Sequence, residues 1–322
     1  MFLAVISALT FAPQHMGSGD AVQPRNTQSV IESISPELPD GVNVSIVGSD
    51  TFVRVRSNGH EVQVLGYEGE PYIRIDTKNV VQVNDASATT VLSSDRYGNV
   101  DLSNFKKSSV PKWRTIATNG EAMWHDHRSH WMSPIKPGVI DDEGTVLRWV
   151  IPMYVDGTVT NVHGTLYLRS SASVLWWAIA FMAAAFGIWL AMKKHEAMKI
   201  VMLAMSVFGV AIGMVEYLGL PGMARITPTL LMFSAAATAL SVVSLVGPRW
   251  NMKRHVAAAL TAGAGGAACV AVWLCSDQVR AAYVPGLTAP WTARIALTAM
   301  AGIGGAAIVD AYMRIARGSD GE

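Results

Sequence analysis

The chain has 322 residues, which is enough for two domains. Charged residues make up 15% and hydrophobic residues 51%, the formal net charge is +1, and the mean hydropathy is +0.29. Without a basic stripe to neutralise phosphates, the chain is not expected to bind nucleic acid. Its two cysteines, Cys269 and Cys275, lie six residues apart in an apolar run, where a disulfide between them is not expected. The residues before about 173 contain no cysteine, so that half of the chain depends on a packed core and not on disulfides.

The first 40 residues divide into an apolar start and a polar stretch. Residues 1–12 are apolar but shorter than the roughly 20 residues that a spanning helix needs. They are typical either of a signal peptide that is removed on export or of an N-terminal anchor that is kept, and both place the following residues outside the cytoplasm. Residues 13–40 are rich in Pro, Gly, Ser and Gln and predict a linker.

From residue 41 the apolar residues recur at every second position, in short runs separated by Gly, Asn, Asp or Pro. The clearest runs are 42–47, 52–56, 62–65, 72–75, 80–83, 147–151 and 159–163. The last two are joined by Asp156-Gly157, a dipeptide typical of β-hairpin turns. Residues 41–172 are therefore predicted to form an all-β domain, an antiparallel sandwich of immunoglobulin-like type.

Residues 173–314 carry five apolar runs, each close to bilayer length. The runs are Val174–Met192, Ile200–Leu218, Thr229–Gly247, Val256–Leu274 and Ile295–Tyr312. Cations gather after the first, third and fifth runs, which by the positive-inside rule are the cytoplasmic ends. The sequence predicts a multi-pass protein of the bacterial cytoplasmic membrane with about five transmembrane helices. The β-domain is expected outside the cytoplasm, and residues 315–322 are expected to form a cytoplasmic tail.

Three of the eight histidines lie in the single stretch Met123–Met132, between tryptophans and methionines. If this stretch is extended, Met123, His125 and His127 project to one face, because side chains alternate along a strand. His130 joins them only if the chain turns soon after His127. The stretch is the main candidate for a functional site.

A metal ion is the first interpretation of this stretch. Imidazoles suit zinc and copper, and a thioether favours copper, particularly Cu(I), although zinc stays possible. The candidate ligands are the side chains of His125, His127, His130, Met132 and Met123. Asp126 and Arg128 would surround them, with Asp126 accepting an imidazole N–H and fixing the tautomer.

A structural network is the alternative interpretation. Alternating His, Asp and Arg can form hydrogen bonds that hold a loop in place, with Trp124 and Trp131 either buried against the sandwich or resting at the membrane interface. A metal site predicts imidazole rings that lie together, whereas splayed rings with their nitrogens bound to protein groups would indicate a network. Neighbouring residues on a strand point to opposite faces, so His125–Asp126 is poorly placed as an acid–base dyad. The motifs identify no class of enzyme.

Within the helices, Glu216 is the carboxylate closest to the hydrocarbon region. An intramembrane acid suggests a transporter or a channel. Its position beside Tyr217 and near Pro221 also allows the side chain to reach the outer lipid headgroups.

Three segments carry a resemblance to known proteins: Gly66–Ile75, Trp124–Met132 and Trp149–Gly157. They resemble a group of uncharacterised bacterial envelope proteins in which an exported β-domain with a WHDHRxHWM motif precedes membrane helices. The layout is also similar to that of bacterial copper-resistance proteins, which join a copper-binding sandwich to membrane helices. The second resemblance implies copper binding by the β-domain.

Three functions follow as hypotheses. The first is an extracytoplasmic copper-binding protein that handles metal, with a membrane partner such as an oxidase or a permease. The second is a non-enzymatic accessory subunit whose β-domain docks a partner and whose histidines are structural. The third is a transporter or channel that uses Glu216.

Overall fold

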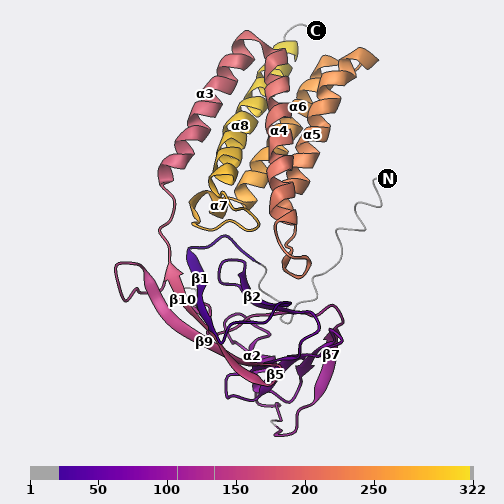
Figure 1. Cartoon of the computed structure of the whole chain (residues 1–322). Coiled ribbons are helices and arrows are strands. Elements are labelled where there is room, and N and C mark those ends of the chain that lie inside the picture. Colours follow the sequence, from indigo (N-terminus) through magenta and orange to yellow (C-terminus); the bar gives the residue numbers. More distant parts are fainter. Residues whose placement is uncertain (1–21, 107, 134, 320–322) are drawn as a thin grey trace. The chain divides into compact units, whose positions relative to one another are not determined.

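The computed structural model describes residues 22–106, 108–133 and 135–319. It contains two compact units (Figure 1). The first comprises the residues up to Ser170 together with Leu220–Arg225, and the second comprises Ser171–Gly219 and the residues from Ile226 onward. The first unit is built mainly of strands and the second of helices.

Among the described residues, the first unit has ten strands in two sheets, and every pairing is antiparallel. The strands are β1 (Thr27–Ser35), β2 (Val42–Val47), β3 (Phe52–Ser57), β4 (Val62–Leu65), β5 (Pro71–Ile75), β6 (Val81–Asn84), β7 (Trp113–Ala117), β8 (Glu121–Trp124), β9 (Thr145–Val155) and β10 (Thr158–Leu168). The larger sheet has the order β1-β10-β9-β4-β5-β6-β7, and the smaller has the order β2-β3-β8. A short helix, α2 (Ala88–Leu92), follows β6.

The two sheets share one hydrophobic core, as the alternation of apolar residues predicts. Val53 and Trp124 from the smaller sheet and Tyr72 and Ile151 from the larger sheet are all fully enclosed in it. The expectation of an antiparallel two-sheet domain is thereby confirmed. The division into seven and three strands differs from the four and three strands of an immunoglobulin constant domain.

The predicted linker over residues 13–40 is wrong for Thr27–Ser35. Thr27–Ser35 forms β1, the edge strand that pairs with β10. Its inward positions hold Thr27 and Ser29, which are buried although they are polar. Because these positions carry no large apolar side chain, the usual alternation is missing from the sequence. Residues 13–21, and the signal peptide or anchor expected over 1–12, lie outside the described residues.

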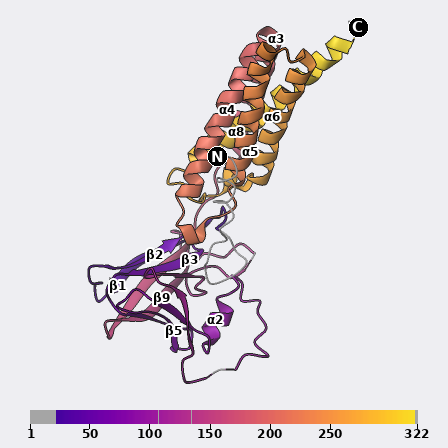
Figure 2. The ribbon, with the colours of Figure 1, turned by 90° about the vertical axis from the view of Figure 1, so that its right-hand side faces the viewer.

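The second unit consists of helices, five of which are long and apolar enough to cross a membrane within the described residues (Figure 2). Its elements are η1 (Val174–Trp177), α3 (Ala178–Lys193), α4 (His195–Leu218), α5 (Thr229–Val246), η3 (Gly247–Trp250), α6 (Arg254–Leu274), α7 (Asp277–Arg280) and α8 (Trp291–Ser319). The short η2 (Gly222–Ala224) lies within Leu220–Arg225 and so belongs to the first unit. The five predicted apolar runs all fall within the five candidate spans, which are Val174–Lys193, His195–Leu218, Thr229–Trp250, Arg254–Leu274 and Trp291–Ala316. Because α8 continues to Ser319, the tail expected from residue 315 is helical over its described part.

The long helices approach one another closely at small residues. A β-carbon on Gly265 of α6 would collide with the carbonyl oxygen of Gly304 on α8, and one on Gly209 of α4 would collide with the hydroxyl of Ser234 on α5. Small residues that allow such close approach are typical of helix packing in membranes. These glycines therefore serve the packing of the bundle.

Candidate functional site

The histidine-rich stretch begins where β8 ends. Trp124 is the last residue of β8 and lies in the core. The chain then turns, because the backbone N–H of Ser129 donates to the carbonyl of Asp126 at 2.9 Å and its hydroxyl donates to the same oxygen at 3.1 Å. The extended arrangement with Met123, His125 and His127 on one face is therefore wrong. The turn that His130 needs to approach the other two histidines is present.

Asp126 is the anchor of this turn. Its carboxylate is fully buried and accepts hydrogen bonds from Trp124 Nε1 at 2.9 Å and from Arg128 Nε and Nη2 at 2.8 Å each. Burial alone would raise the pKa of Asp126, but the bonds from Arg128 and Trp124 hold that pKa below its usual value. The expectation that Asp126 accepts an imidazole N–H is wrong, because its oxygens are engaged by these two neighbours.

Arg128 and Tyr67 connect this turn to the segment after β4. Arg128 Nη2 donates to the carbonyl of Leu65 at 3.2 Å, and the guanidinium lies 5.1 Å from the centre of the Tyr67 ring. The hydroxyl of Tyr67 accepts the backbone N–H of His127 at 3.0 Å, and the two rings stack at 5.5 Å. Two segments some 60 residues apart in sequence are thus joined by side chains that the sequence pattern alone did not connect.

Each of the three imidazoles donates one ring N–H to a backbone carbonyl. The donors are Nδ1 of His125 to Thr51 at 2.7 Å, Nε2 of His127 to Asp95 at 2.9 Å, and Nε2 of His130 to Arg96 at 2.7 Å. A carbonyl oxygen only accepts, so the proton in each bond must lie on the ring nitrogen. The bonds therefore fix the tautomer of each neutral ring.

The rings lie together. The ring centres of His127 and His130 are 5.3 Å apart and those of His125 and His130 are 6.0 Å apart, both in edge-to-face contact. His125 also stacks on Phe52 at 4.4 Å. The splayed arrangement that would have opposed a metal site is not found.

One ring nitrogen of His130 has no hydrogen-bond partner among the residues that the structure describes. Its side chain is 1% exposed, and Nδ1 is buried with no hydrogen-bond partner among the described residues. Burial, and then the nearby charge of Arg96, lower the pKa of His130 to about 3. The ring is therefore neutral near pH 7, with a lone pair on Nδ1, which is the form that binds a metal.

Met132 lies on the outer side of the same group. The terminal methyl of Met132 and Cε1 of His127 are 3.3 and 3.2 Å from the position that a β-carbon would take on Gly98. Both side chains thus border one small space beside Gly98, and Met132 is 40% exposed. Met123, by contrast, is enclosed within β8, opposite Arg54 in the register.

The distances between rings can be compared with those of a metal centre. An imidazole bound at about 2 Å holds its ring centre about 3.2 Å from the ion, so two tetrahedrally placed rings have centres about 5 Å apart. His127 and His130, at 5.3 Å, match this spacing more closely than His125 and His130, at 6.0 Å. Over the described ranges, no group of three His, Cys, Asp or Glu side chains has an arrangement that could hold an ion. The arrangement that remains is two imidazoles with a neighbouring thioether.

Glu216 lies on α4 and is only 7% exposed. Its Oε1 is buried and has no hydrogen-bond partner within the described part of the chain. A β-carbon on Gly286 would collide with the carbonyl oxygen of Glu216, so the backbone is tightly enclosed as well. The expected escape of this side chain toward lipid headgroups is therefore wrong.

Fold and site define a protein that joins an antiparallel two-sheet domain to a bundle of five apolar helices of membrane-spanning length. No family model matches the chain, and the searches of curated proteins and of solved structures gave no match either.

Proposed function

We propose that the chain is a membrane protein whose β-domain binds a soft metal ion, with Cu(I) as the preferred ion. The ligands in this proposal are Nδ1 of His127, Nδ1 of His130 and the thioether of Met132. One observation carries it: His130 keeps a buried nitrogen that no described protein group engages, while its other nitrogen is fixed by Arg96. Metal-bound histidines almost always donate their second N–H to a carbonyl or carboxylate in this way.

The donor set favours copper over zinc. Cu(I) accepts few ligands and prefers soft donors such as a thioether, whereas zinc in structural sites usually takes four ligands. His125 would lie behind the pair, in ring contact with His130, and Asp126 and Arg128 would hold the turn without touching the ion. A neutral His130 would bind without first losing a proton.

The wider role in this proposal is metal handling or the assembly of a membrane complex outside the cytoplasm. The charge of the loops supports this orientation, because cations are concentrated at one set of helix ends. The resemblance to copper-resistance proteins in layout points the same way. A membrane partner such as an oxidase or permease would deliver or receive the ion.

A second candidate is a docking subunit in which the histidines are purely structural. The three bonds from imidazole to backbone carbonyl, together with the bonds between Asp126, Trp124 and Arg128, favour it. A third, transport through Glu216, is supported by the burial of that carboxylate among the helices.

Titration of the full-length protein with Cu(I), without oxygen and against a coloured Cu(I) chelator, tests the proposal. The His127→Ala/His130→Ala variant should lose at least a hundredfold in affinity. The matched control is His60→Ala/His163→Ala, which removes two histidines away from the cluster and should bind like the wild type. Equal affinity in the wild type and the first variant would exclude this site. A partner complex that forms unchanged in both variants, with chelator present, would instead support the docking subunit.

A further inference from the structure

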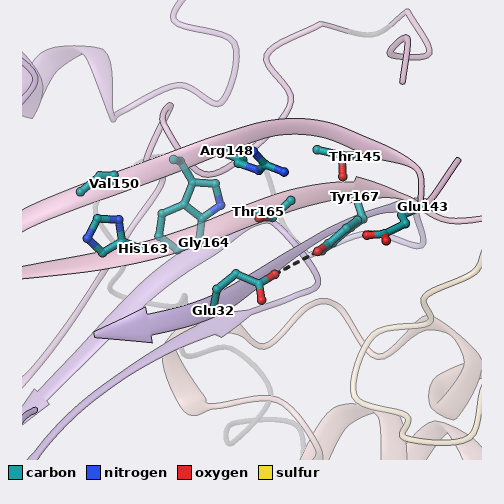
Figure 3. Close-up of a pocket in the computed structure, with 10 residues that line it drawn as sticks. Glu32, Glu143, Thr145, Arg148, Val150, His163, Gly164, Thr165 and Tyr167 are labelled. Carbon is teal, nitrogen blue, oxygen red and sulfur yellow. Dashed lines mark hydrogen bonds between the residues drawn. The ribbon is translucent and has the colours of Figure 1, made fainter. Parts of the chain in front are cut away.

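A hollow of about 440 Å³ lies on the outer face of β1, β10 and β9, away from the histidine cluster (Figure 3). Its polar lining includes Glu32, Glu143, Arg148, His163, Thr165 and Tyr167. Its volume falls within the ordinary range for small-molecule sites. None of the proposed metal ligands lines it.

Irregularities in the strands create the hollow. The register between β1 and β10 shifts between Ile31 and Ser33, and Glu32 is the extra residue. A second shift occurs where β10 meets β9, between Leu166 and Tyr167. Such bulges bend a strand and change the direction of its side chains. Glu32 and Tyr167 are thereby placed together, and the hydroxyl of Tyr167 donates to Glu32 Oε1 at 3.0 Å.

The floor of the hollow depends on a glycine. Gly164 on β10 lies opposite Trp149 on β9, and the indole occupies the space that a β-carbon on Gly164 would need. The glycine therefore makes room for the indole, which covers β10 at this point. The close-up shows His163 on one side of Gly164 and Tyr167 and Glu143 on the other (Figure 3).

The lining carries both carboxylates and a guanidinium, and only some of these groups take part in hydrogen bonds between described side chains. Glu32 is engaged by Tyr167, but Arg148 and Glu143 make no ion pair or side-chain hydrogen bond with any described residue. A small anion would meet two carboxylates here, and a small cation would meet the guanidinium of Arg148. An apolar ligand would remove water from all of these polar groups without replacing the lost hydrogen bonds, which is energetically unfavourable. An uncharged ligand whose hydroxyls both donate and accept hydrogen bonds can serve the carboxylates and the guanidinium at the same time.

We propose that this hollow binds a saccharide. Each sugar hydroxyl can donate to Glu143 or Glu32 and accept from Arg148, and the threonine hydroxyl of Thr165 can do either. The apolar faces of a sugar ring can rest on Val150 and on the Tyr167 ring. Arg169 lies 4.3 Å from the centre of the Tyr167 ring, over one of its faces.

Ligand-observed saturation-transfer NMR on the full-length protein tests this site. The detergent must contain no sugar, since a maltoside headgroup would compete. The probes are three disaccharides, namely maltose, cellobiose and N,N′-diacetylchitobiose, with free glutamate as a charged comparison. The test variant is Glu143→Gln/Arg148→Gln. The control is Glu121→Gln/Arg56→Gln, which removes an exposed ion pair between β3 and β8 and so makes the same change of charge elsewhere.

At least one disaccharide should bind the wild type and the control, and bind the test variant at least tenfold more weakly. Circular dichroism should show the same fold in all three proteins. The proposal is overturned if none of the disaccharides binds, if the test variant binds as well as the control, or if glutamate binds in their place. A failure of Cu(I) binding would leave this result unaffected.

Discussion

Gly98 offers the most direct test of the proposed metal site, because it touches two of the proposed ligands without being one. Its φ of +67° is in the left-handed region, so alanine there costs about 1–2 kcal/mol of stability whatever surrounds it. The added methyl would also lie 3.2 Å from Cε1 of His127 and 3.3 Å from the methyl of Met132. These contacts are tight, so the two side chains must move by a few tenths of an ångström.

Such a movement matters more for a metal site than for a structural network. Metal–ligand distances tolerate only about 0.2 Å, so displacement of two ligands should weaken Cu(I) binding by about tenfold, or 1.4 kcal/mol. Gly59 provides the control, because its φ is +81° and a β-carbon there meets nothing within 4 Å. Gly59→Ala has the same kind of backbone cost and no contact with the cluster.

The measurement is the Cu(I) competition titration, with thermal unfolding of the metal-free proteins alongside. Gly98→Ala and Gly59→Ala should differ in affinity by about tenfold. If the two variants bind Cu(I) equally and both match the wild type, the space beside Gly98 is not the binding site. The reasoning from His127 and Met132 would then be refuted.

Three further predictions concern the stability of the β-domain. The pKa of His130 is lowered to about 3, so below pH 6.5 the unfolded chain binds a proton at this residue that the folded protein does not bind. The free energy of unfolding should therefore fall by up to about 1.4 kcal/mol per pH unit between pH 6.5 and 3. Thermal unfolding of His130→Gln should lack this dependence on pH. Asp126→Asn leaves the mostly buried Arg128 without its counter-charge, so it should cost about 3–5 kcal/mol in the same assay, and a loss below 1 kcal/mol would contradict the anchoring role. The hydrogen bond from His60 to Asp156 raises the pKa of His60. The stability that this pair adds to the fold is therefore complete below the unfolded pKa of 6.5 and is lost as the pH rises through the raised pKa. An NMR titration of His60 that shows no upward shift of its pKa would disprove this prediction.

The parts of the fold that the sequence predicted are those governed by burial of apolar side chains. Seven strands showed alternating residues, and five helices showed long apolar runs, because in each case the pattern follows directly from which faces are buried. β1 was missed because Thr27 and Ser29 fill its inward positions and pairing with β10 holds it in place. β8 was obscured because it has four residues and leads at once into the turn at Asp126.

The site was predicted in its residue types but not in its connections. The grouping of His125, His127 and His130 follows from their spacing once the chain turns. Their hydrogen-bond acceptors are backbone carbonyls from distant segments, and a carbonyl group gives no sign in the sequence of where it will lie. The mistaken role for Asp126 has a local cause: Trp124 and Arg128, each two residues away, are stronger or nearer donors than any imidazole.

The structural and metal interpretations of the cluster share most of their interactions and differ at one atom. Bonds from imidazole N–H to a carbonyl stabilise a loop, and the same bonds orient a histidine for a metal. A purely structural role would be complete with those bonds, yet Nδ1 of His130 is buried with no hydrogen-bond partner in the described part of the chain, which costs about 1–3 kcal/mol. Glutamine at that position could keep a donor for the carbonyl of Arg96 without a ring lone pair. His130→Gln should therefore abolish Cu(I) binding while leaving the fold intact near pH 7, and a variant that binds as tightly as the wild type would show that His130 is not a ligand.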